Sequence, residues 1–408
     1  MILKKIELHN FRNYESLMTR FYKGINIIYG DNAQGKTNLL ESIYVLGLTK
    51  SHRSFIDNNL IKNGCESLMI KGTVSGGLFD KELQITIDNK SKGYKIDDNS
   101  IKKVSDYISN MNIIIFYPDD LETLKGSPQL RRKYLNMELS QLYNSYYVVL
   151  NDYNKLLKMR NEYLKKMNKG KDVDMNYFDI ITSYLIEKAI IIYQMRYKFI
   201  EKINETCGQI YKDIMGIDDF HIEYVSNMKI EDMKDPNLKD KLFDLYKKQL
   251  SYEQRVCITT IGPHKDDFNF MVGENNLKLY GSQGQQRIAV LTLKLSEIPI
   301  FKKYKETTPI LLLDDVFSEL SDDKKNNLIK YISKDIQTII TTTELNNLDS
   351  KLVKKAKLFK IEQGKLTKIK EVKDNEWRTT LWCFRYTSLR RVRSCKKKTR
   401  YVYRYYRC

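Results

Sequence analysis

The segment GDNAQGKT, residues 30–37, constrains the fold of this chain more than any other. It follows a short apolar run at 24–30 and precedes a run at 36–50 whose apolar residues have helical spacing. A glycine-rich turn between a strand and a helix, ending in Gly-Lys-Thr, is the pattern of a P-loop, whose backbone N–H groups surround phosphate oxygens. We therefore predict that the phosphates of ATP are bound by Gly30, Asp31, Asn32, Ala33, Gln34, Gly35, Lys36 and Thr37.

A P-loop also needs a carboxylate for its metal ion, and a second apolar segment supplies a candidate. PILLLDD at 309–315 is continuously apolar, as in the middle strands of parallel sheets, and ends in Asp314 and Asp315. We predict that Thr37 and Asp314 hold Mg²⁺, Asp314 through water, and that Asp315 orients the attacking water. Lys36, Asp314 and Asp315 are then the catalytic residues. The alternative is that the two acids only cap the segment that follows.

The pattern of apolar residues predicts an α/β fold interrupted by a helical insertion. Strand-like runs lie at 2–9, 24–30, 113–118, 309–315 and 336–343, with hairpins at about 68–88 and 357–369. Between them, two runs at 129–167 and 178–203 place apolar residues at steps of three and four, and the polar turn NKGKD at 168–172 joins them. Two such helices pack antiparallel. The predicted domains are an N-terminal lobe (1–125), a helical arm (126–254), a C-terminal lobe (255–372) and an atypical basic tail (373–408).

A second polar, glycine-punctuated segment, GSQGQQR at 281–287, stands directly before an amphipathic run. The start of a helix favours anions, so this segment suits a phosphate. It has no P-loop lysine and is therefore not an independent site. We predict that Ser282, Gln283, Gly284 and Gln285 complete a nucleotide site whose other half lies on a second copy, so that ATP joins two chains.

Charge and composition limit the partners and the compartment. The formal net charge of +19 suggests a polyanionic partner, with nucleic acid first and an anionic membrane second, although excess lysine can also serve solubility alone. The six cysteines lack metal-ligand spacing and are interpreted as reduced thiols. We find neither a signal peptide nor an apolar run of membrane-spanning length. We therefore expect a cytoplasmic protein with no membrane partner.

The order of P-loop, helical insertion, serine–glycine–glutamine segment and acid-ended strand resembles the ABC-type ATPase heads of the SMC-like group. Within it, the chain is most similar to the RecF family of bacterial recombination proteins. The resemblance covers 1–372 and is carried by LHNFRNYE (8–15), KSHRSF (50–55), FYPDDLETLKGSPQLRRKYLN (116–136), GPHKDDF (262–268), YGSQGQQR (280–287), LLLDDVFSELS (311–321) and ITTT (340–343).

The resemblance implies a function in recombinational DNA repair and replication restart. It implies a weak ATPase used as a switch, which dimerises with ATP and Mg²⁺ on single-stranded, gapped or duplex DNA and acts with the RecO and RecR mediator proteins to load RecA and support the SOS response. Ser282–Gln285 would be the signature segment and Ser318–Leu320 the loop that pairs across the dimer. Two other functions remain open: an ABC transporter ATPase subunit, which the arm and the absence of a switch histidine disfavour, and a P-loop kinase or nucleotidase, which would not need Ser282.

Several further residues carry two interpretations each. Lys125, Arg131, Arg132 and Lys133 either contact DNA phosphates or form an exposed helix start. His52 and Arg53 either bind nucleotide or DNA or are structural. His264 is more often structural than catalytic in such a position, although the resemblance puts it near the nucleotide.

The last segment differs from the rest of the chain in composition. Residues 373–408 hold 12 of the Lys and Arg but only 2 acids, and they include both tryptophans of the chain. A basic aromatic tail can stack on single-stranded bases. Alternatively, codons can be chosen for 387–404 that read QVLEGLEAVRKRPGMYIG one base later, which resembles the start of the B subunit of DNA gyrase. We favour out-of-frame translation as the origin of this tail.

Overall fold

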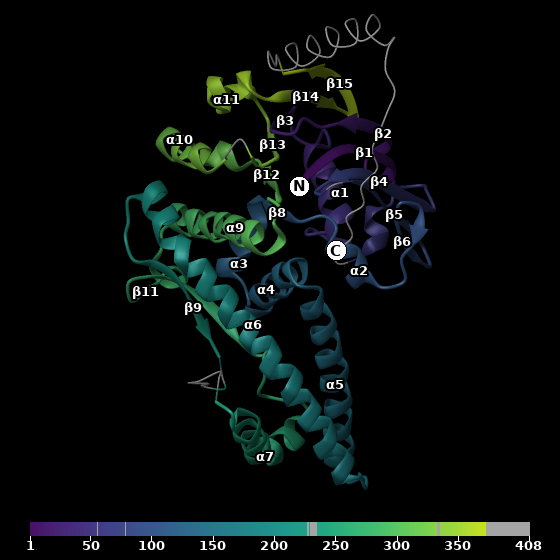
Figure 1. The fold of residues 1–408 in the computed structure, drawn as a ribbon, viewed down its shortest axis with the longest axis vertical. Helices are drawn as coiled ribbons and strands as arrows, with labels where there is room; N and C mark the ends of the chain where they lie inside the picture. Colours follow the sequence, from purple (N-terminus) through teal and green to yellow (C-terminus); the bar gives the residue numbers. More distant parts are fainter. Residues whose placement is uncertain (55, 78, 227, 229–234, 333–334, 373–408) are drawn as a thin grey trace, which may run out of the picture. The chain divides into compact units, whose positions relative to one another are not determined.

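The computed structural model of the chain describes residues 1–54, 56–77, 79–226, 228, 235–332 and 335–372 (Figure 1). Residues 1–370 form one compact unit. The tail at 373–408 lies outside the described residues, so its out-of-frame origin stays a prediction.

The central sheet is six-stranded, with the order β15-β14-β3-β13-β12-β8. Its strands are β3 (Ile25–Tyr29), β8 (Ile113–Phe116), β12 (Ile310–Asp314), β13 (Thr338–Thr342), β14 (Lys357–Glu362) and β15 (Lys365–Lys370). All neighbours are parallel except β14 and β15, which form the expected hairpin. The strands predicted from apolar runs are confirmed. Because β3 and β12 are parallel members of one sheet, the P-loop and the aspartates lie at the same edge.

A second six-stranded sheet, with order β2-β1-β4-β5-β6-β7, is antiparallel throughout. Its strands are β1 (Ile2–Phe11), β2 (Tyr14–Arg20), β4 (Ser67–Ser75), β5 (Asp80–Asp88), β6 (Lys92–Ile96) and β7 (Asn99–Ser100). Helix α1 (Lys36–Leu48) packs its apolar residues into one core with inward residues of this sheet and of the central sheet. A Cβ on Gly72 would lie 2.4 Å from the Leu46 side chain, so a glycine is needed where β4 meets α1.

The helical arm leaves the head through α4 (Pro128–Leu142) and consists of α5 (Asn144–Asn168) and α6 (Met175–Met215), which lie side by side (Figure 1). The antiparallel pair is confirmed. The spacing of apolar residues predicted one continuous helix for the first run, and this prediction is wrong. Tyr143 is extended (φ −135°, ψ 113°) and separates α4 from α5. Helix α7 (Leu238–Val256) packs beside both arm helices. The boundary proposed at 254–255 stays a prediction.

A three-stranded sheet joins the arm to the second half of the head. Its order is β11-β10-β9, formed by β9 (Phe220–Val225), β10 (Asp267–Val272) and β11 (Asn275–Asn276). The remaining described elements are η1 (Asp57–Leu60), α2 (Val104–Ile108), η2 (Pro118–Leu121), α3 (Glu122–Lys125), α8 (Leu277–Tyr280), α9 (Gln283–Lys305), η3 (Val316–Glu319), α10 (Asp322–Tyr331), η4 (Leu345–Asn347) and α11 (Ser350–Lys354).

A buried charged cluster ties α9 to α4 and η2. Lys294 lies 3.6 Å from a Glu138 carboxylate oxygen, and Tyr134 donates a hydrogen bond to Glu297. Asp120 accepts a hydrogen bond from the Tyr117 backbone at 3.0 Å. Burial raises the pKa of Asp120 to about 7, with Lys294 acting against that rise. Burial also raises the pKa of Glu138 and of Glu297, which face the same lysine.

Among the described residues, no helix combines the length and the hydropathy that a bilayer crossing requires.

Candidate nucleotide site

The loop between β3 and α1 has the backbone geometry that a phosphate-binding turn needs. Gly30 and Gly35 have φ of 149° and 111°, values that disfavour any side chain, and Ala33 is left-handed at 64°. A Cβ on Gly30 would lie 2.3 Å from the Ile361 carbonyl oxygen. These glycines let consecutive N–H groups turn inward, and α1 adds its N-terminal dipole. Asp31, Asn32 and Ala33 are exposed, and Gln34 is half-buried.

Two turns from distant parts of the chain hold this loop in place. The β14–β15 turn donates from Gln363 N–H to the Gln34 side-chain oxygen (2.5 Å) and from Gly364 N–H to the Gln34 carbonyl (2.9 Å). The β1–β2 turn supplies Tyr14, whose hydroxyl donates to the Gly35 carbonyl at 2.9 Å. The loop is therefore supported from both ends of the described chain, which sequence reasoning did not anticipate.

Lys36 is folded back onto the loop. Its ammonium donates to the carbonyl oxygens of Gly30 and Asp31, both at 2.7 Å. Burial lowers the pKa of Lys36, and the charges of Asp315, Asp314 and Asp31 act against that shift. The side chain thus stands among carboxylates at the mouth of the loop, where it can exchange two carbonyl partners for phosphate oxygens.

The predicted metal ligands are together. The Thr37 hydroxyl donates to Asp314 Oδ1 at 3.1 Å, and the Thr341 hydroxyl donates to the same oxygen at 2.5 Å. Burial raises the pKa of Asp314, while the hydrogen bonds from Thr341 and Thr37 lower it. Thr341, which the sequence analysis included only as part of the ITTT segment (340–343), holds the carboxylate in position.

Asp315 differs from Asp314 in having an unused oxygen. Its backbone is left-handed (φ 51°), and its N–H donates to the Thr341 hydroxyl at 3.0 Å. Its buried Oδ1 atom has no hydrogen-bond partner among the described residues. Such an orphan acceptor beside a phosphate loop fits a group that binds water or a hydrated cation. The residues present therefore fit Mg²⁺ bound by Thr37 and Asp314.

Ser282–Gln285 begin helix α9, as the sequence predicted. Ser282 is the N-cap: its hydroxyl accepts from Gln285 N–H at 3.3 Å, and Gln285 Oε1 accepts from Ser282 N–H at 2.7 Å. Ser282, Gln283 and Gly284 are exposed. Among the described residues, no hydrogen bond or ion pair connects this segment to the 30–37 loop.

Arg287 ends the GSQGQQR segment, but the sequence analysis assigned it no role. It lies in the first turns of α9 and is buried. Burial lowers the pKa of its guanidinium, and the charge of Asp315 acts against that lowering. Arg287 therefore links the base of α9 electrostatically to Asp315 of the same chain.

Glu41 on α1 interacts with two arginines, Arg12 and Arg53. Arg12 binds it with two hydrogen bonds (3.0 and 2.8 Å), Ser51 donates to it at 2.5 Å, and Arg53 lies 3.6 Å away. The Arg12 hydrogen bond opposes burial and lowers the pKa of Glu41. Neighbouring His52 is half-buried between two tyrosine rings, and desolvation of its imidazole lowers its pKa to about 3. The structure favours structural roles for Arg12 and His52.

Arg131, one candidate for DNA contact, is instead a buried structural residue. Its guanidinium forms two hydrogen bonds with Asp267 (2.6 and 2.9 Å), and it also caps the carbonyls that end α3. It is 3% exposed, so the proposal that it contacts DNA phosphate is wrong. Lysine and arginine neighbours in a sequence can point to opposite sides of a helix. Lys125, which is exposed, and Arg132 and Lys133, which are half-buried, remain candidates for phosphate contact.

His264 also has a structural environment. Its Nε2 donates to the Thr259 carbonyl at 3.0 Å, and its Nδ1 accepts from the Tyr153 hydroxyl at 2.6 Å. Burial lowers its pKa to about 4. These contacts tie the arm helix α5 to the segment before β10, as expected for a structural histidine.

Comparison with known proteins agrees with this geometry. The family described as RecF/RecN/SMC N terminal domain matches residues 2–367. The DNA replication and repair protein RecF of Ligilactobacillus salivarius (strain UCC118) is 38% identical over 369 residues, which cover 90% of this chain and 97% of that protein. The RecF protein of Bacillus cereus (strain G9842) is 38% identical over 366 residues, covering 89% and 98%.

The chain belongs to the RecF family. A solved structure of the recombination mediator protein RecF with ATP, in the RecFOR pathway, has a TM-score of 0.83 at 32% identity and covers 90% of this chain and 97% of its own. The Smc head domain from Pyrococcus furiosus has a TM-score of 0.51 at 16% identity, covering 94% and 99%, and shows the shared fold alone. The predicted fold class, an ABC-type ATPase head with an inserted helical arm, is confirmed.

Proposed function

We propose that this protein is an ATP-dependent DNA-binding switch of recombinational repair. The observation that carries the proposal is the arrangement at the carboxyl edge of the central sheet. A glycine turn with Lys36 faces a buried carboxylate on Asp314, which Thr37 and Thr341 orient, and an acceptor on Asp315 that has no described partner. These are the parts that phosphoryl transfer from ATP requires.

Thr37 and Asp314 would hold Mg²⁺, which when bound would neutralise charge on the phosphates of ATP. Lys36 exchanges its loop carbonyls for phosphate oxygens. Asp315 orients a water for slow hydrolysis through the oxygen that lacks a described partner. Slow hydrolysis of this kind would determine how long the ATP-bound dimer persists before its two chains separate.

The site is completed by a second copy of the chain. Ser282, Gln283, Gly284 and Gln285 stand at the exposed start of α9 with a helix dipole behind them. This end of α9 would approach the γ-phosphate held by the partner's P-loop, so ATP drives dimerisation.

The partners follow from the family and the charge. The solved relative is a recombination mediator of the RecFOR pathway, and the curated relatives are DNA replication and repair proteins. We propose DNA with single-stranded gaps as the substrate, RecO and RecR as partners, RecA loading as the outcome, and the cytoplasm as the compartment. Residues 1–372, without the tail, still carry a formal net charge of +9, which supports a polyanionic partner. The proposed domain boundaries are those predicted from the sequence: an N-terminal lobe at 1–125, an arm at 126–254 and a C-terminal lobe at 255–372.

Sedimentation with ATP, ADP or no nucleotide tests the switch. The wild type is expected to dimerise with ATP alone. Lys36→Ala should abolish the dimer by removing phosphate binding, while Lys23→Ala, at an exposed lysine outside the loop, should leave it unchanged. An ATP-loaded Lys36→Ala dimer would refute the switch.

The in-trans role of α9 needs its own variants, because Ser282 also caps the helix. Ser282→Arg should bind ATP as a monomer but fail to pair. Ser282→Asn keeps an N-cap side chain and controls for the loss of the cap, which costs about 1 kcal/mol. Wild-type pairing by Ser282→Arg would remove the role assigned to this segment.

A further inference from the structure

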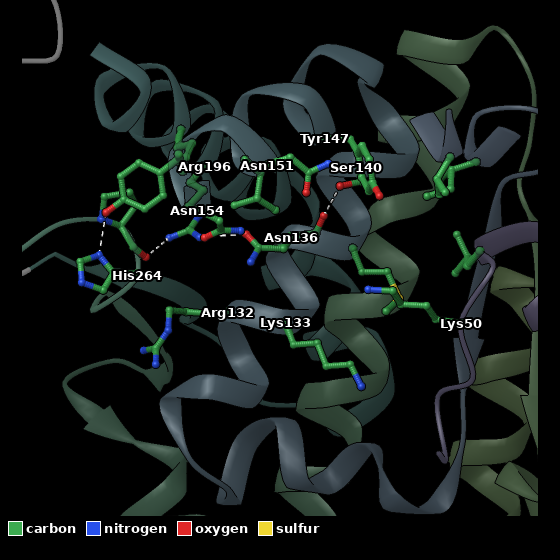
Figure 2. Close-up of a pocket in the computed structure, with 18 of the residues that line it drawn as sticks. Lys50, Arg132, Lys133, Asn136, Ser140, Tyr147, Asn151, Asn154, Arg196 and His264 are labelled. Atoms are coloured by element: carbon green, nitrogen blue, oxygen red, sulfur yellow. Dashed lines mark hydrogen bonds between the residues drawn. The ribbon is translucent and has the colours of Figure 1, made fainter. Parts of the chain in front are cut away.

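A pocket of about 810 Å³ lies at the base of the arm, apart from the nucleotide site. The end of α1, helix α2 and helices α4, α5 and α6 contribute its walls (Figure 2). Its lining residues, all in the described part of the chain, include none of 30–37, 282–285 or 314–315. The volume falls in the range of ~300–1,000 Å³ that ligand pockets occupy.

The pocket is cationic. Lys50, Arg132, Lys133 and Arg196 line it, and its described lining contains no Asp or Glu. Figure 2 shows Arg132, Lys133 and Lys50 along one side. Burial and the neighbouring charge of Lys50 lower the pKa of Lys133. Two ammonium groups that repel each other at the rim gain most from an anion placed between them.

The remaining walls suit a flat, polar ring. Asn136, Asn151 and Asn154 lie across the middle of Figure 2, with Tyr147 at one end. The Asn136 side-chain oxygen accepts from the Arg196 guanidinium at 2.9 Å and from the Tyr146 hydroxyl at 2.7 Å. Its amide NH₂ therefore remains to donate to a ligand. Leu48, Ile108 and Leu150 add apolar surface.

Arg196 makes the inner end of the pocket rigid. Its guanidinium also donates to the Pro263 carbonyl (2.6 Å) and to the hydroxyls of Tyr146 and Tyr224 (3.2 and 3.3 Å). These partners are neutral oxygens, so they fix the guanidinium without cancelling its charge. The pocket is thus preformed, with a fixed positive inner end and the lysines Lys50 and Lys133 further out.

We propose that this pocket binds a nucleoside phosphate, with the phosphate between Lys50 and Lys133 and the base against Tyr147 and the asparagine amides. An unpaired nucleotide of a DNA strand and a free nucleotide share this chemistry. The first source rests on the DNA binding proposed above, whereas the second does not. Amide groups and an aromatic ring recognise a base that is out of its stack, which a paired duplex does not offer.

The test uses the full-length protein and two probes. The first is a fluorescein-labelled single-stranded 12-mer carrying one 5-iodouracil, and the second is free deoxyuridine monophosphate. Lys50→Gln, Lys133→Gln and Asn154→Trp, which fills the pocket from an exposed position, should each weaken 12-mer binding about fivefold. Lys158→Gln, an exposed lysine on α5 outside the lining, should bind as wild type.

Irradiation should cross-link the iodouracil to Tyr147, as mapped by mass spectrometry. Competition by the free monophosphate identifies a free nucleotide as the occupant, and pocket-dependent binding without such competition identifies a strand. Wild-type affinity in all three pocket variants, or cross-links only outside the pocket, would overturn the proposal. ATP-driven dimerisation is measured on the wild type and on the same variants. If the wild type does not dimerise with ATP, the proposed switch is refuted. If the variants dimerise with ATP and also bind the 12-mer as wild type does, only the proposed pocket is refuted.

Discussion

Thr341→Val is the perturbation that examines the site most directly. Valine has nearly the shape of threonine, and Thr341 is fully buried, so the change removes a hydroxyl and little else. That hydroxyl donates to Asp314 at 2.5 Å and accepts from Asp315 N–H at 3.0 Å. Its loss leaves both aspartates without the group that fixes their relative positions.

The expected magnitude follows from those two hydrogen bonds. A hydrogen bond to a charged group contributes about 1.5–3 kcal/mol, and a backbone donor left unsatisfied costs about 1–3 kcal/mol. Asp314 keeps its bond from Thr37, which offsets part of the loss. We expect Thr341→Val to lower the free energy of unfolding by about 3 kcal/mol at pH 8.

The pH dependence gives this prediction a second readout. Burial already raises the pKa of Asp314, and the Thr341 hydrogen bond opposes that rise, so the variant should raise it further. A group with a raised folded pKa stabilises the protein at low pH and loses that contribution as pH rises through the folded pKa. The stability gap between wild type and Thr341→Val should therefore widen from pH 5 to pH 8.

Urea unfolding at both pH values, with and without MgATP, measures the effect. Thr341→Ser keeps the hydroxyl and should lose less than half as much stability. MgATP should stabilise wild type and Thr341→Ser but not Thr341→Val. The reasoning is refuted by a valine variant with the wild-type urea midpoint at pH 8, or by a serine variant as unstable as the valine one.

Three further predictions concern other parts of the molecule. Arg131→Met should lower the free energy of unfolding by about 3 kcal/mol by leaving Asp267 unpaired, while Arg132→Met should cost less than about 1 kcal/mol; equal losses in urea would contradict the buried position of Arg131. The pKa of Asp120 is about 7 in the folded protein against 3.8 in the unfolded chain, so its contribution to the free energy of unfolding is present below pH 3.8 and lost by pH 7. The stability of Asp120→Asn relative to wild type should therefore rise across that pH range in urea titrations. A constant difference in stability would contradict this assignment. The logarithm of single-stranded DNA affinity should fall linearly with the logarithm of salt, and Lys133→Gln should reduce that slope by ~0.7; an unchanged slope would remove Lys133 from the phosphate contacts.

The sequence predicts the parts of this fold that depend on local pattern. Apolar spacing and the positions of glycines correctly predicted three elements: the strand before Gly30, the strand that ends at Asp314 and the helix after Ser282. The break at Tyr143 escapes that reasoning. Leu142 and Tyr146, on either side of it, are both buried, so the apolar spacing continues across the break without interruption.

The parts that the sequence does not reveal depend on partners far away in the chain. Arg131 looks like one of several basic residues until Asp267, 136 positions later, is placed beside it. The function of Thr341 becomes visible only when β13 lies next to β12 and its hydroxyl reaches Asp314. Basic residues and threonines have no local pattern that separates a buried structural partner from a surface contact.

The support of the P-loop by Gln363 and Gly364 has a consequence for biosynthesis. The glutamine that receives these hydrogen bonds, Gln34, leaves the ribosome early, but its donors follow 329 and 330 residues later. Strand β3 likewise lacks both of its neighbours in the central sheet, β13 and β14, until those strands have been synthesised. A nascent chain therefore lacks two of the hydrogen bonds that hold its phosphate loop until the last hairpin has been translated.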